Sequence, residues 1–159
     1  MSRPSLSTAL TREHHEIDAA IEAFTVDLQR QAARPESLLT AIEALRRHIY
    51  LEEHFLFPPI REAGVLMPIL VMLREHGVLW GLMDELTELL GDNDPDDVSD
   101  HLLSTCRELL ARLDQHNNKE EAIIYPHAET DLTEDSAAEL ADFLKSGSAP
   151  TDWVCEAAR

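Results

Sequence analysis

Six side chains capable of binding a metal stand where a helical sequence should place apolar core residues. Each lies on a stripe of apolar residues spaced three and four apart, which is typical of the buried face of a helix. Imidazole and carboxylate groups are ligands of transition metals, and a buried carboxylate without a cation costs several kcal/mol. The pattern therefore predicts a buried metal site built from His14, His48, Glu52, His76, His116 and Glu120.

Two of the histidines are each followed by a glutamate four residues later. The pairs are His48 with Glu52 and His116 with Glu120. Residues four apart share one face of a helix, one turn from each other. Within such a pair, the histidine nitrogen and the carboxylate can bind the same ion, or the carboxylate can bridge two ions.

The sequence around these pairs is repeated. Residues 48–58 follow the pattern H-x3-E-E-x3-F-P, and residues 116–126 match it position for position with tyrosine in place of phenylalanine. The other two histidines sit in matching Glu-His pairs at 13–14 and 75–76. The chain is therefore expected to contain two related helix pairs whose half-sites face each other, which favours a centre of two metal ions over a single ion.

The elements that must position these residues are long helices. The apolar stripes predict helices over about 7–31, 35–57, 67–90 and 95–126, with the second and fourth ending at Pro58-Pro59 and Pro126. Their connections are short, so neighbours in sequence are antiparallel. We expect an all-α, up-down-up-down four-helix bundle over about 7–126, a short fifth helix at about 133–145 and a tail at 146–159. At about 1.5 Å per residue, the four histidines lie within roughly one turn of the same height.

Composition limits the remaining possibilities. The chain has 159 residues, of which 44% are hydrophobic, so we expect one domain over 1–159 with a substantial core. Its formal net charge of −18 argues against nucleic acid or an anionic membrane as partner. Cys106 and Cys155 form no CxxC motif, which favours a reducing, cytoplasmic location. Met1 to Leu10 shows no signal-peptide pattern, and no apolar run is long enough to span a membrane.

The other histidines are expected at the surface or rim of the bundle. They are His15, His54, His101 and His127. His14 is preferred to His15 as a ligand because it precedes Ile17 by three residues, as His76 precedes Leu79. Core packing is the expected role of the Phe57 and Tyr125 side chains. A hydrogen bond from the Tyr125 hydroxyl to a metal-bound ligand is the alternative.

The combined pattern H…HxxxE…H…HxxxE resembles the hemerythrin-like family, the HHE cation-binding domain, over about residues 7–145. The resemblance implies a non-haem centre of two iron ions per chain with oxo or hydroxo and glutamate bridges, held by the six residues above. The oxygen-carrying members have a further histidine where this chain has Trp80, and they end in HxxxxD. With four histidines and two glutamates, the chain looks more like bacterial members linked to oxidative and nitrosative stress.

Two functional classes remain open. The first is a redox protein that reacts with peroxide, nitric oxide or O2, with peroxidase-like, catalase-like or nitric-oxide-oxidising activity, and with no catalytic group beyond the metals. The second is a non-catalytic protein that binds, carries or senses O2, nitric oxide or iron. A haem bundle would leave both glutamates unexplained. The first class is favoured because fewer protein ligands leave more open metal positions.

Overall fold

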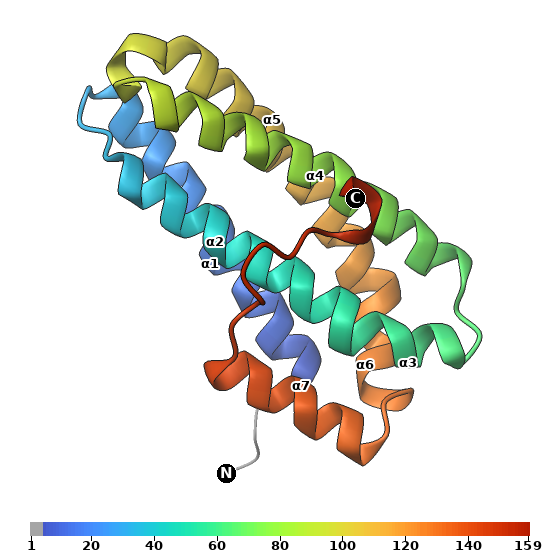
Figure 1. Cartoon of the computed structure of the whole chain (residues 1–159). Coiled ribbons are helices and arrows are strands. Elements are labelled where there is room, and N and C mark those ends of the chain that lie inside the picture. Colours follow the sequence, from blue (N-terminus) through green and yellow to red (C-terminus); the bar gives the residue numbers. More distant parts are fainter. Residues whose placement is uncertain (1–4) are drawn as a thin grey trace.

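Four long helices form a bundle in the computed structural model, which describes residues 5–159. They are α1 (Leu6–Gln29), α2 (Pro35–Leu51), α4 (Met67–Asp92) and α5 (Ser99–Lys119). Each packs against two of the others, in the cyclic order α1, α2, α4, α5. Successive helices run in opposite directions (Figure 1). The predicted all-α, up-down-up-down architecture is confirmed.

Local signals in the sequence fix several helix starts. The Ser5 side chain accepts a hydrogen bond from the Thr8 amide at the start of α1, and Pro35 stands in the first turn of α2. Asp94, which stands before a proline, caps the short 3₁₀ turn η2 (Pro95–Val98) by accepting a hydrogen bond from the Asp96 amide.

The second and fourth bundle helices do not end at their prolines, and this part of the sequence prediction is wrong. Each continues through a π-helical turn, η1 (Glu52–Leu56) or η3 (Glu120–Ile124), into a short helix, α3 (Phe57–Glu62) or α6 (Tyr125–Thr130). A π turn adds one residue to the helix. Each proline then falls in the first turn of a new helical segment, where its missing amide hydrogen has no role.

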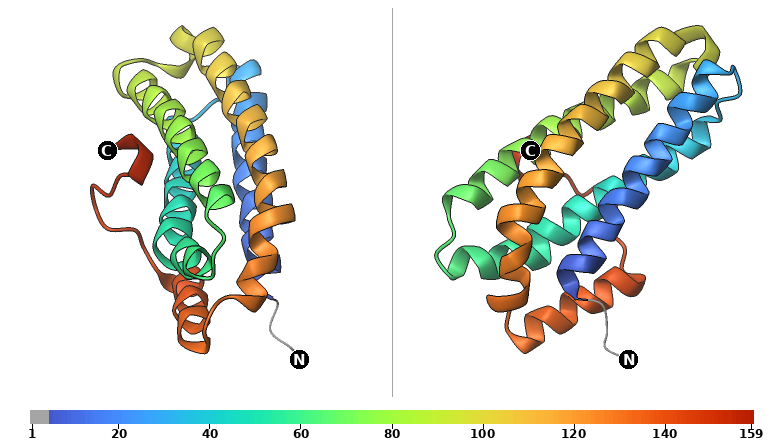
Figure 2. Two further views of the ribbon diagram at one scale, coloured as in Figure 1. Left: turned by 90° about the vertical axis from the view of Figure 1, so that its right-hand side faces the viewer. Right: turned by 180° about the vertical axis from the view of Figure 1, so that it is seen from behind.

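The C-terminal part of the chain wraps around the bundle. Helix α7 (Glu134–Ser146), close to the predicted 133–145, crosses one end of the bundle (Figure 2). The chain then runs over α2 and ends beside α4 with the turn η4 (Glu156–Ala158) (Figure 1). Trp153 packs on the bundle, with its ring centroid 5.0 Å from that of Tyr50 and 5.5 Å from that of Trp80.

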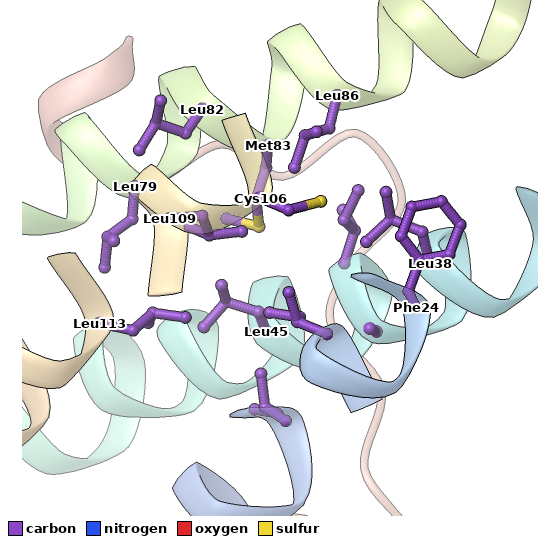
Figure 3. Close-up of a cluster of buried hydrophobic side chains, with 14 of the residues drawn as sticks. Phe24, Leu38, Leu45, Leu79, Leu82, Met83, Leu86, Cys106, Leu109 and Leu113 are labelled. Carbon is purple, nitrogen blue, oxygen red and sulfur yellow. The ribbon is translucent and has the colours of Figure 1, made fainter. Parts of the chain in front are cut away.

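Two apolar clusters fill the bundle, one toward each end. The larger includes Leu45, Met83, Cys106 and Leu113 (Figure 3). The smaller joins the ends of α1, α4 and α6 to α7. Within residues 5–159, no helix combines the length and apolarity needed to cross a membrane. The expectation about residues 1–10 concerns in part residues 1–4, which lie outside those described.

Candidate metal centre

All six residues predicted as ligands meet in one buried layer between the two apolar clusters. None is more than 3% exposed. Their ligand atoms form two groups, and within each group the atoms lie within 4.8 Å of one another. Both groups contain Glu52 and Glu120; His14 and His48 complete one, and His76 and His116 complete the other. Two overlapping groups with two shared carboxylates can hold two neighbouring ions.

The distances between donor atoms suit a common ion in each group. Nε2 of His14 lies 3.1 Å from Glu120 Oε1, and Nε2 of His76 lies 3.1 Å from Glu52 Oε1. The pairs within one helix are similar, at 3.4 Å for His48 with Glu52 and 3.3 Å for His116 with Glu120. Two ligands bonded to one ion at about 2.1 Å lie about 3 Å apart. The donor set therefore fits a centre of two metal ions.

The protonation of the layer shows that it needs positive charge. Burial opposes a charged imidazole at His48, but the carboxylates of Glu52 and Glu13 outweigh it and raise its pKa to about 10. Burial also opposes ionisation of Glu120, yet the neighbouring histidines hold its pKa well below the ordinary value. Its Oε2 atom is buried and accepts no hydrogen bond. The pKa values of His76 and His116 are raised in the same way by the neighbouring glutamates, so protons on these imidazoles and on His48 take the place of the positive charge of metal cations.

The second ring nitrogen of every histidine in the layer meets a further glutamate. The Nδ1 atoms donate to these carboxylates at 2.7–2.9 Å. Each glutamate comes from the next helix around the bundle, so the four contacts close a ring. We call these four residues the orienting glutamates: Glu13 (to His48), Glu53 (to His76), Glu75 (to His116) and Glu121 (to His14). Such partners fix the ring and the tautomer of a metal-binding histidine.

The orienting glutamates were missed as functional residues, although a signal for them exists. Each is the immediate sequence neighbour of a predicted ligand, in the Glu-His and Glu-Glu pairs of the internal repeat. Adjacent residues on a helix point about 100° apart. When one faces the bundle axis, its neighbour faces the adjacent helix, where a histidine of that helix lies.

Tyr125 also reaches the centre, so core packing alone does not explain it. Its hydroxyl donates to Glu52 Oε2 at 2.7 Å and lies 2.7 Å from His14 Nε2 and 3.1 Å from His48 Nε2. The π turn is the reason, because its wider turn brings Tyr125 onto the same face as Glu120, five residues earlier. Burial and the two carboxylates raise the pKa of Tyr125 well above its usual value, so the hydroxyl keeps its proton.

Comparison with known families agrees with this geometry. The family described as Hemerythrin HHE cation binding domain matches residues 5–128. The chain belongs to this family. Neither curated proteins nor solved structures gave a match. The matched region of the hemerythrin domain contains all six predicted ligands, all four orienting glutamates and Tyr125.

The remaining histidines of this hemerythrin domain lie outside both groups, as expected. His15 and His54 are exposed, His101 pairs with Glu85, and His127 pairs with Asp131. Trp80 is buried. Its ring packs under the Arg46 guanidinium and against Trp153.

Proposed function

We propose that this hemerythrin domain holds two iron ions and reacts with a small oxidant. The observation that carries the proposal is the pair of overlapping donor groups that share Glu52 and Glu120. Imidazole and carboxylate together suit iron, whereas zinc sites are usually four-coordinate and hold one ion. When bound, two iron ions would supply electron transfer and Lewis acidity to the centre.

The chain itself would orient and protect the reacting molecule. The orienting glutamates hold the imidazoles in place, and the two apolar clusters exclude bulk water. Tyr125 can hold a proton at the substrate's oxygen, because its hydroxyl already lies among the six ligand residues. We infer that Tyr125 donates a hydrogen bond to the substrate, which extends the sequence-based alternative of a hydrogen bond from its hydroxyl to a metal-bound ligand.

The substrate must be small. A pocket of about 50 Å³ reaches His116 between α4 and α5, lined also by Glu75, Leu79 and Arg112. The six ligand residues are at most 3% exposed, so only a small molecule such as peroxide, nitric oxide or O2 can reach them. We therefore propose a role in oxidative or nitrosative stress defence. The free, buried thiols of Cys106 and Cys155 are compatible with a cytoplasmic location.

Non-catalytic binding, carriage or sensing of O2, nitric oxide or iron is the second candidate. It is supported by the Tyr125 hydroxyl at the centre, since one hydrogen-bond donor is sufficient to hold a bound diatomic molecule. Redox turnover is favoured because Trp80 occupies the position of the seventh ligand of oxygen carriers. Two ions that share six protein ligands rather than seven leave more coordination positions open to exogenous molecules.

The test combines metal analysis with turnover. Wild-type protein produced with iron available should contain two irons per chain, and the iron-loaded protein should consume peroxide or nitric oxide over many cycles. Glu120→Gln should lose iron, whereas Glu108→Gln, an exposed substitution on α5, should not. One zinc and no iron would overturn the di-iron proposal. Reversible binding of O2 without consumption of any oxidant would favour the second candidate.

A further inference from the structure

Glu53 differs from the other orienting glutamates because its second oxygen is held by the end of the chain. Its Oε2 atom accepts from His76 Nδ1 at 2.7 Å, and its Oε1 atom accepts from the backbone amide of Glu156 at 3.0 Å. We call residues 147–159 the C-terminal segment. A direct chain of hydrogen bonds thus runs from the C-terminal segment through Glu53 to a predicted metal ligand.

The C-terminal segment is seated on the bundle by close packing. Trp153 lies against Tyr50 and Trp80, and Cys155 is fully buried. Ala157 approaches α4 so closely that a Cβ atom added at Gly77 would lie 2.8 Å from the Ala157 Cβ atom. Glycine at 77, next to His76, is therefore what lets the segment reach Glu53.

The start of the same segment is tied to a second orienting glutamate. Arg47 donates to Gly147 O at 2.9 Å and to Glu13 Oε2 at 3.0 Å, while Glu13 accepts from His48. By contrast, Glu75 is held by Lys119 from within the bundle. The C-terminal segment and the end of α7, which lie outside the region that matches the family, therefore support two of the four orienting contacts.

We propose that the C-terminal segment is a positioning element that fixes His76 through Glu53, so that its docking and metal binding stabilise each other. The inference rests on the proposed metal centre. Outer partners of metal-binding histidines typically contribute 10–100-fold to affinity, and coupling between two binding events is reciprocal. Undocking the segment should therefore weaken the group of Glu52, His76, His116 and Glu120 by about tenfold, and metal should slow undocking.

The experiment uses Gly77→Ala, with Gly81→Ala on the same helix as matched control. A Cβ atom at Gly81 would meet nothing within 4 Å, so only Gly77→Ala should displace the segment. Cys155 reports docking through its rate of labelling by a thiol reagent, and Cys106, buried inside the bundle, reports unfolding. We expect Gly77→Ala to speed labelling of Cys155 but not Cys106, and to speed release of one of two ions to a chelator about tenfold.

Rescue and spectroscopy separate positioning from general damage. Gly77→Ala combined with Ala157→Gly removes the Cβ clash and should restore slow labelling and slow release. Cobalt(II), loaded in place of iron, should show altered visible bands in Gly77→Ala and normal bands in Gly81→Ala and the rescued variant. If Gly77→Ala does not fold, Trp153→Ala can take its place, because it changes the C-terminal segment far from His76 in sequence. We expect the same faster labelling of Cys155 and faster metal release.

The outcomes distinguish this inference from the proposed function. Faster Cys155 labelling with unchanged cobalt bands and metal release would show a segment that only packs, and would overturn the inference. Equal Cys155 labelling in metal-free and loaded wild-type protein would also overturn it. Failure of the wild-type protein to bind iron or cobalt would instead overturn the metal centre itself.

Discussion

Each histidine of the centre divides its two ring nitrogens between two partners. Nε2 faces the shared carboxylates, and Nδ1–H donates to an orienting glutamate of the next helix. An ionised carboxylate can only accept, so the contact fixes the hydrogen on Nδ1 and leaves the Nε2 lone pair for a metal. The centre thus depends on ten acidic and imidazole side chains rather than six.

Tyr125→Phe should separate hydrogen bonding to the substrate from metal binding. The variant should keep two metal ions, because all six predicted ligands remain, but consume oxidant about 10²-fold more slowly, the scale of losing one hydrogen-bond donor at the reacting oxygen. Tyr50→Phe is the control, since Tyr50 packs against Trp153 and lies outside both donor groups. Turnover by Tyr125→Phe at the wild-type rate would contradict a role for the hydroxyl.

Metal uptake should release protons at neutral pH. Without metal, the carboxylates around His48 and His76 raise the pKa of both imidazoles, to about 10 for His48, so protons are present at pH 7. A protonated imidazole cannot bind a metal, and binding must displace these protons. Apparent affinity should therefore rise with pH from neutrality toward about 10 and fall in acid. A pH indicator in a weakly buffered protein solution should detect the released protons when metal is added. Metal binding without proton release would contradict this prediction.

At the scale of helices, the apolar stripes were sufficient to predict four long helices and the six residues that meet between them. The stripes could not reveal the two π turns, because a proline after an apolar stripe is usually a helix end. The position of Tyr125 follows from one of these turns, so the sequence left its role open. The orienting glutamates were not predicted for a different reason. Each one contacts a histidine of another helix, and the apolar stripe of a single helix does not show contacts between helices.

Arg47 joins α7 to the bundle and should be sensitive to a conservative change. Its guanidinium donates to the carbonyl oxygens of Phe143, Leu144 and Gly147 at the end of α7. Lysine lacks the planar fork, so Arg47→Lys should cost about 1–3 kcal/mol. At about 2–4 °C per kcal/mol, the melting temperature should fall by several degrees. Arg112→Lys, a change at an exposed residue, should leave the melting temperature unaltered. An equal fall in the melting temperature of both variants would contradict the role of the Arg47 contact.

For the whole molecule, a buried layer of charge crosses a bundle that is otherwise apolar in its interior. The layer separates the two apolar clusters, and it takes residues from all four long helices and both π turns. Ions bound there would connect every part of the bundle at once. The chain also carries a net charge of −18, which favours association with cations in general.

Metal loading should consequently stabilise the entire fold. Ligand at about 1,000 times its dissociation constant adds about 4 kcal/mol to the folded state, which at this chain length raises the melting temperature by roughly 10 °C. Scanning calorimetry of metal-free and iron-loaded protein measures the difference. Measuring the stability of Glu120→Gln in the metal-free and iron-loaded states completes a thermodynamic cycle. The substitution should lower the free energy of unfolding far more with iron than without it. Calcium should give no comparable rise, since the imidazole nitrogens are poor partners for a cation that prefers oxygen ligands. An equal rise with calcium would mean that cations act on the acidic surface and not at the buried layer. An equal cost of Glu120→Gln with and without iron would mean that this carboxylate supports packing alone.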